Sequence, residues 1–316
     1  MITSSFCGTC ATIRKMHRFV MFILFITCCA TVHGQSADDE IACSAYRGQD
    51  NSAYKKKLWD GYEISLGPAR NSVGSGDECT AAIFNRAGKV VYRTTGFNVV
   101  FDEDETGEDF DGDGHPEVVF KTDTGGGMHC CWAYNVVSLS PRPHKLVEIA
   151  EAGAVDFRKD EHGRMVIWAI EPGLYGYTSM AENPFAQKVF RVKEGKLVDV
   201  TPDYCSAILK GEGRHYQDAQ RRLTPERIKR FKNGTGSAWG SSENSETVNA
   251  VLTVALQHVF CRQFDRALAD LELWPEATKA KMKADFAKAM KTEYPDFAAR
   301  LTGQEHPPAR SADQKH

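Results

Sequence analysis

The sequence predicts an α+β fold, with an antiparallel β-rich N-terminal domain followed by an α-helical C-terminal domain. Between residues 61 and 200, short runs rich in Val, Ile, Tyr and Phe alternate with turn signals, and no helical pattern separates them. From residue 201 to 302, apolar residues recur at helical spacing instead. Because tight turns join the strands, the sheets are expected to be antiparallel. A chain of 316 residues has room for both parts.

The expected strands are short and follow one another closely. They lie at residues 62–66, 81–84, 89–92, 117–120, 132–139, 165–168 and 188–192. Gly-containing turns at residues 86–88, 161–163 and 194–195 predict hairpin connections. Residues 35–60 are polar and are interpreted as a lead-in to the β domain.

Helix start signals mark the C-terminal domain. Thr201 and Thr224 each precede a proline, which predicts an N-cap hydroxyl with proline at the first helical position. Apolar residues keep helical spacing from 248 to 271, and a further helix is expected to start at Trp274-Pro275-Glu276. Pro295 is expected to bend or break that helix. Residues 233–245 are predicted to form a loop, and residues 303–316 a disordered tail.

Residues 1–34 have the composition of a secretory signal peptide. Arg14, Lys15 and Arg18 precede an apolar run from Phe19 to Ala30, which is short for a membrane span. Whether the segment is cleaved or retained as an anchor is left open. Its removal leaves 36 basic and 42 acidic residues, a net charge of −6, and no basic cluster typical of nucleic-acid binding. We therefore expect a secreted or periplasmic protein with no membrane span after signal removal.

Six cysteines remain after removal of the signal peptide. An even number in an exported chain favours disulfide bonds. Six cysteines allow fifteen pairings, so the connectivity stays open; Cys205 with Cys261 and Cys43 with Cys79 are two candidate pairs. The adjacent Cys130 and Cys131 are interpreted as structural disulfide cysteines, with a thiol-redox site as the alternative.

The most informative segment is an acidic loop. Nine of the sixteen residues from 102 to 117 are acidic and none is basic, a density of like charge that a bound cation would neutralise. Carboxylates alternate at Asp109, Asp111 and Asp113, and Glu117 closes the loop before a predicted strand. Ca²⁺ takes six to eight oxygen ligands, and a curled chain can supply them from these side chains and from the His115 carbonyl. An EF-hand would need Glu at position 12 and a following helix, whereas Phe120 and a strand stand here.

Residues 109–120 resemble the calcium loop of FG-GAP/VCBS-type repeats, found in integrin-like propellers and in secreted bacterial proteins. The Gly-Gly-Gly-Met-His-Cys-Cys-Trp segment at 125–132 is similar to the Gly-Gly-x-His-Cys-Cys stretch that accompanies such a loop in a group of uncharacterised exported bacterial proteins. The resemblance implies that Asp109, Asp111, Asp113, His115 (carbonyl) and Glu117 bind Ca²⁺. The family usually repeats the motif, and this chain contains a single copy.

These observations predict an exported calcium-binding protein. The leading hypothesis is a non-enzymatic binding or envelope-associated module with a protein or glycan partner. A secreted hydrolase of glycans or peptides with a structural calcium is one alternative, and a thiol-redox protein using Cys130 and Cys131 is the other. The Gly-x-Ser-x-Gly and His-Glu-x-x-His motifs are both absent from the sequence.

Overall fold

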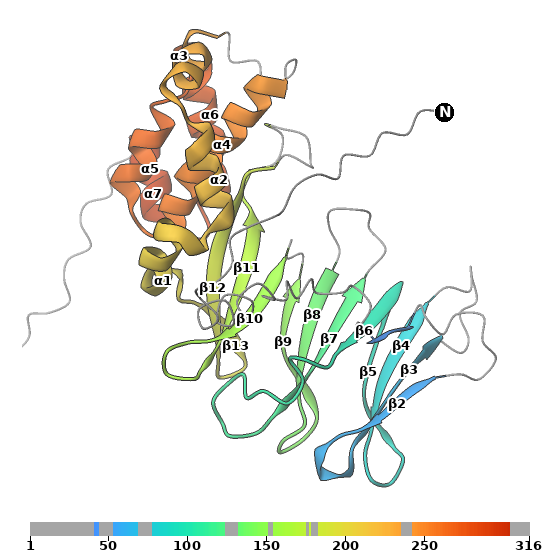
Figure 1. Cartoon of the computed structure of the whole chain (residues 1–316). Coiled ribbons are helices and arrows are strands. Elements are labelled where there is room, and N and C mark those ends of the chain that lie inside the picture. Colours follow the sequence, from blue (N-terminus) through green and yellow to red (C-terminus); the bar gives the residue numbers. More distant parts are fainter. Residues whose placement is uncertain are drawn as a thin grey trace, which may run out of the picture. The chain divides into compact units, whose positions relative to one another are not determined.

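The computed structural model describes residues 41–43, 53–68, 78–123, 132–150, 154–174, 177, 183–234 and 242–303 (Figure 1). All of them belong to one compact unit, Glu40–His316. The predicted signal peptide, the segment containing Cys130 and Cys131, and all of the predicted tail except residue 303 lie outside the described residues.

The α+β prediction is confirmed. The described residues contain antiparallel sheets in the N-terminal part and seven α-helices in the C-terminal part. The first sheet has the strand order β2(Tyr54–Lys57), β3(Glu63–Pro68), β4(Cys79–Phe84), β5(Val90–Gly96). The second has the order β1(Ile41–Ala42), β6(Asn98–Asp102), β7(Glu117–Asp123), β8(Trp132–Ser138), β9(His144–Ala150). The third has the order β10(Val155–Lys159), β11(Met165–Pro172), β12(Phe185–Lys193), β13(Lys196–Asp199). The three predicted hairpin turns join β4 to β5, β10 to β11 and β12 to β13.

The second sheet is covered on both faces. Along β7, Val118 and Phe120 belong to a core shared with the first sheet, while Val119 belongs to a core shared with Ile167 of the third sheet. All three side chains are fully buried. Because successive strand residues point to opposite faces, burial on both faces requires the continuous apolar run that begins directly after Glu117.

The β structure begins earlier than the sequence predicts. Within residues 35–60, which we interpreted as a lead-in, lie β1, paired with β6, and β2, paired with β3. Three lysines in β2 made that segment polar, yet they suit an edge strand because their charges oppose further pairing. A disulfide joins Cys43, which directly follows β1 of the second sheet, to Cys79 in β4 of the first sheet, with 5.8 Å between the Cα atoms.

All of the α-helices in the described residues come after the last strand in the sequence. They are α1(Thr201–Ala207), α2(Arg214–Arg222), α3(Pro225–Asn233), α4(Ser242–Phe260), α5(Phe264–Leu271), α6(Glu276–Met290) and α7(Pro295–Leu301), with a π-helical turn at Ile208–Glu212. Thr224 caps α3 by accepting a hydrogen bond from the Arg227 N–H, as predicted. Thr201 does not cap α1, because its hydroxyl contacts the backbone of Val189 in β12.

Other helix boundaries also differ from the sequence pattern. The helical spacing from 248 to 271 spans two helices, α4 and α5, and Arg262 between them has φ +55°. The start of α4 at Ser242 shortens the predicted loop of residues 233–245. Pro295 begins α7, so the expected break is confirmed. None of the described helices combines the length and apolar content needed to cross a bilayer.

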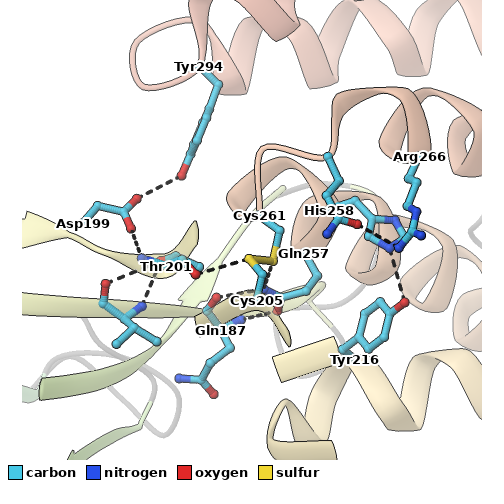
Figure 2. The surroundings of a disulfide bond; sticks show 12 residues. Gln187, Asp199, Thr201, Cys205, Tyr216, Gln257, His258, Cys261, Arg266 and Tyr294 are labelled. Atoms are coloured by element: carbon cyan, nitrogen blue, oxygen red, sulfur yellow. Dashed lines mark hydrogen bonds between the residues drawn. A yellow bond between two sulfur atoms is a disulfide. The ribbon is translucent and has the colours of Figure 1, made fainter. Parts of the chain in front are cut away.

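Helix α4 is tied to the third sheet by two kinds of contact. The buried Gln257 side chain donates to the Gln187 carbonyl at 3.0 Å and accepts from the Gln187 N–H at 2.8 Å (Figure 2). Next to it, a disulfide joins Cys205 of α1 to Cys261 at the end of α4, with 5.6 Å between the Cα atoms (Figure 2). These contacts, together with buried Ala186 of β12 in the helical core, fix the helices to the sheet.

Candidate metal centre

The acidic loop connects β6 to β7 and is closed at its base by backbone hydrogen bonds. The Gly107 N–H donates to the Glu117 carbonyl at 2.8 Å, and the Glu117 N–H donates to the Glu108 carbonyl at 2.9 Å. Phe110, only 3% exposed, packs edge-to-face on Phe157 of β10, with 5.4 Å between ring centroids. The loop is therefore anchored by a buried ring and by a strand that is buried on both faces.

Inside the loop the aspartates curl the backbone. The two carboxylate oxygens of Asp109 accept from the N–H groups of Gly112 at 2.7 Å and Gly114 at 2.9 Å. Asp111 accepts from the Asp113 N–H at 3.1 Å. Gly112 and Gly114 have φ values of +79° and +86°, a conformation that residues with a Cβ rarely adopt. Glycines alternating with aspartates therefore allow the chain to turn back on itself within a few residues.

Three of the five predicted ligand residues converge. Asp109, Asp111 and Glu117 each offer a carboxylate oxygen, and these oxygens lie within 4.8 Å of one another. Ca²⁺–oxygen distances are about 2.3–2.6 Å, so ligands on opposite sides of the ion are separated by about 4.6–5.2 Å. The spacing of the three oxygens is thus compatible with a single Ca²⁺ ion between them.

Glu117 is the most unusual member of this group. Its side chain is fully buried, and its Oε2 accepts from the Phe110 N–H at 2.7 Å. Its Oε1 is buried and has no hydrogen-bond partner among the described residues. An unpartnered buried carboxylate oxygen is costly, and coordination to a cation is one way to offset that cost.

The environment of Glu117 disfavours its charged form. Burial raises its pKa from 4.5 to about 7, and the nearby charges of Asp111 and Asp109 act in the same direction against the opposing Phe110 N–H. Burial also raises the pKa of Asp111, with repulsion from Asp113 and Asp109 adding to it against hydrogen bonds from the backbone. Burial and mutual repulsion of these carboxyl groups thus outweigh the hydrogen bonds that favour their ionised forms, and a bound cation would favour ionisation.

The other two predicted ligand residues lie differently. Asp113 is exposed, stands outside the converging group, and accepts from the His115 N–H at 2.8 Å. His115 is also exposed. The placement of Asp113 and of the His115 carbonyl as ligands stays a prediction.

A cavity of about 340 Å³ opens beside the converging carboxylates. Asp109 and Asp111 line it together with Lys159, Arg164 and Arg191 from the third sheet and its first hairpin. Each basic side chain already pairs with a carboxylate: Lys159 with Glu108 at 2.7 Å, and both arginines with Asp160 at 2.9 Å. The buried Nε of Arg191 has no hydrogen-bond partner among the described residues.

A second polar cluster, in the helical part, has the Tyr–His–Asp hydrogen-bond arrangement that some catalytic sites use. His258 Nδ1 lies 2.6 Å from Asp270 Oδ2, and His258 Nε2 lies 3.3 Å from the hydroxyl of Tyr216. His258 and Tyr216 are buried, however, and the neighbouring Cys261 is in a disulfide (Figure 2). This excludes Cys261 as a free thiol nucleophile with His258 as its base, and the cluster is interpreted as a buried hydrogen-bond network.

Sequence reasoning missed one further feature, a cavity of about 520 Å³ near the first sheet. Its lining includes Trp59, Asp60, Arg86 and His115. Asp60-Gly61 was a recognisable hairpin signal, but the residues come from separate turns and share no sequence motif.

Comparisons with family models, with curated proteins and with solved structures found no match to this chain. The geometry of the sites is therefore the basis for the functional conclusion.

Proposed function

We propose that this chain is an exported protein that binds one Ca²⁺ ion in the β6–β7 loop, and that it acts as a non-enzymatic binding or envelope-associated module. The observation that carries the metal assignment is the buried, unpartnered Oε1 of Glu117, a residue whose carboxylate converges with those of Asp109 and Asp111. Asp113 and the His115 carbonyl are proposed as further ligands.

The chemistry of the donor set favours Ca²⁺ over softer metals. The converging side chains are all carboxylates, and hard oxygen ligands suit Ca²⁺, Mg²⁺ and Mn²⁺ rather than ions that prefer sulfur or imidazole. Both Asp109 oxygens already accept hydrogen bonds from backbone N–H groups, which limits how they can be arranged around an ion. Ca²⁺ tolerates a variable number and geometry of oxygen ligands, whereas Mg²⁺ requires near-ideal octahedral geometry.

The proposed role of the ion is structural. Glu117 is the first residue of β7, so a cation at its Oε1 links the loop directly to a strand buried between two cores. Neutralising the loop carboxylates would remove the repulsion that opposes their approach. Calcium would thus stabilise the β domain without taking part in a reaction.

The disulfides support the exported part of the proposal. Cys43–Cys79 and Cys205–Cys261 fit an extracellular or periplasmic protein, because such bonds persist in oxidising compartments.

Calorimetric titration of the chelator-treated protein with CaCl₂ tests the metal assignment. We expect saturable binding of one ion per chain, a higher melting temperature with calcium, and weaker binding of Mg²⁺. The variants Asp111→Asn and Glu117→Gln should each weaken calcium binding at least about tenfold, which corresponds to about 1.4 kcal/mol.

Asp104→Asn is the matched control. Asp104 is an exposed carboxylate of the same acidic stretch and lies outside the converging group, so its substitution should leave calcium affinity nearly unchanged. Absence of binding at millimolar calcium, or equal affinity in Asp111→Asn, Glu117→Gln and the wild type, would show that the loop is not a calcium site.

A further inference from the structure

The cavity of about 520 Å³ lies where four connections meet. They are the β2–β3 turn with Trp59 to Tyr62, the β4–β5 turn with Asn85 to Ala87, the end of the acidic loop at His115 and Pro116, and the β8–β9 loop from Leu139 to Pro141. Pockets that hold small ligands have volumes of about 300–1,000 Å³. The cavity is therefore large enough for a small organic molecule.

The two turns that form one side of this cavity are preorganised. In the β2–β3 turn, Asp60 and Gly61 have φ values of +53° and +74°, as a tight hairpin turn requires. In the β4–β5 turn, the Asn85 side chain accepts from the N–H groups of Ala87 and Lys89, each at 3.0 Å. The Asn85 hydrogen bonds fix the backbone that carries Arg86, and the Tyr62 N–H, which donates to the Trp59 carbonyl at 3.2 Å, closes the turn that carries Asp60.

Arg86 connects the two turns. Its Nε donates to the Asp60 carbonyl at 2.6 Å, and its side chain lies against Gly61, where a Cβ would come within 2.5 Å of the Arg86 Cγ. Gly61 is thus required both for its backbone conformation and for the space that Arg86 occupies. The guanidinium is held at the cavity while its terminal NH₂ groups have no partner among the described residues.

The cavity is lined by two aromatic residues and by polar side chains without hydrogen-bond partners among the described residues. Trp59 and Tyr62 are half-buried, and each packs against the core of the first and second sheets while also lining the cavity. The Asp60 carboxylate, the His115 ring and the Ser140 hydroxyl also line it, and none of them has a hydrogen-bond partner among the described residues. Acceptors and donors are therefore both available beside aromatic side chains.

This combination matches the chemistry of a sugar ring. A pyranose has an apolar C–H face that packs on an aromatic ring, and hydroxyl groups that both donate and accept hydrogen bonds. Asp60 can accept and Arg86 can donate such bonds, and their charges balance, so the cavity does not favour an ionic ligand of either sign. We propose that it is a binding site for a neutral saccharide unit, a function distinct from calcium binding.

The test uses saturation-transfer difference NMR and calorimetry on the calcium-loaded protein with four neutral disaccharides: cellobiose, maltose, lactose and N,N′-diacetylchitobiose. Inorganic sulfate serves as the ionic comparator. We expect saturable binding of at least one disaccharide with a dissociation constant of about 1 mM or tighter, and no comparable binding of sulfate.

Two variants locate the binding site. Asp60→Gly keeps a turn sequence that accepts positive φ and removes the carboxylate, and Arg86→Ala removes the donor. Each should weaken disaccharide binding at least tenfold. One matched control is Glu194→Gly, which likewise replaces an acidic residue by glycine at a turn position with φ +51°, in the β12–β13 hairpin. The other is Arg93→Ala, at an exposed arginine of β5 outside the cavity.

Melting temperatures of all four variants report whether they fold. If Asp60→Gly does not fold, the comparison of Arg86→Ala with Arg93→Ala alone tests the proposal. The proposal is overturned if none of the disaccharides binds at millimolar concentration, if sulfate binds more tightly than all of them, or if Arg86→Ala binds as Arg93→Ala does. Calcium titration of the same samples is independent, so failure of saccharide binding is distinguishable from failure of the calcium site.

Discussion

The substitution Glu117→Gln should have opposite effects on stability with and without calcium. Glu117 is fully buried, one of its oxygens has no partner among the described residues, and aspartates surround it. Gln keeps the size and an acceptor for the Phe110 N–H, and its amide can donate to the neighbouring carboxylates. In a chelating buffer the variant should therefore be more stable than the wild type.

The magnitude follows from the pKa of Glu117. Burial raises this pKa from 4.5 to about 7, so the folded protein binds the proton more tightly than the unfolded chain does. Stability from this group is fully present below pH 4.5 and is lost as the pH rises through 7. At 1.36 kcal/mol per pKa unit, the loss approaches about 3 kcal/mol at pH 8 and is small at pH 5. Gln does not titrate, so its advantage should appear at pH 8 and nearly vanish at pH 5.

Urea unfolding of both proteins measures the effect, first with EGTA at pH 5 and 8 and then with excess CaCl₂ at pH 8. Calcium at about 1,000 times its dissociation constant should stabilise the wild type by about 4 kcal/mol, and Glu117→Gln by much less, which reverses their order. Glu105→Gln is the control. Burial together with repulsion from Asp102 and Glu108 raises the pKa of Glu105 to about 7 as well. Unlike Glu117, however, Glu105 lies outside the group of converging carboxylates.

Glu105→Gln should thus gain as much from calcium as the wild type. The reasoning is refuted if Glu117→Gln is less stable than the wild type in EGTA at pH 8, or if calcium stabilises both proteins equally.

Three further predictions concern the scaffold. Replacing Cys205 and Cys261 by Ser should lower the free energy of unfolding by about 4 kcal/mol, the chain-entropy value for a separation of 56 residues, and a loss below about 1 kcal/mol in urea unfolding would contradict it. Burial raises the pKa of Asp160, but hydrogen bonds from the Arg164 backbone and side chain outweigh this effect and lower the pKa overall. The stability that Asp160 provides is therefore present above about pH 4 and is lost as the pH falls. The difference in melting temperature between wild type and Asp160→Asn should shrink below pH 4, and a constant difference would be inconsistent with this. Thr224→Ala removes the cap of α3 and should cost about 1 kcal/mol in the same urea assay, whereas no change would mean that the cap does not contribute.

Local patterns predicted the elements whose signals are contained in a few residues. The apolar run after Glu117 predicted β7, and its burial on both faces explains why the run is continuous. The Gly-containing hairpins and the Thr224 cap were predicted for the same reason, since their hydrogen bonds form within one turn. Strand β2 was missed because an edge strand can be polar, and its pairing with β3 is not written in its own composition.

In the candidate metal site, too, local features could be predicted from the sequence and features set by tertiary packing could not. The alternating aspartates predicted a curled loop, because their side chains and the backbone interact over two to five residues. Which carboxylate is buried depends on the packing of three sheets, so the sequence could not distinguish Glu117 from the exposed Asp113. The larger cavity gave no signal, because Trp59, Arg86 and His115 meet only in the folded chain.

A crystal structure of the calcium-loaded protein, with anomalous scattering used to locate the ion, would show directly whether the β6–β7 loop binds calcium. We expect one Ca²⁺ in the β6–β7 loop, with oxygens of Asp109, Asp111 and Glu117 at about 2.3–2.6 Å and the Glu117 Oε1 among the ligands. An ion bound elsewhere, or a loop without an ion and with Glu117 Oε1 still unpartnered in saturating calcium, would contradict it.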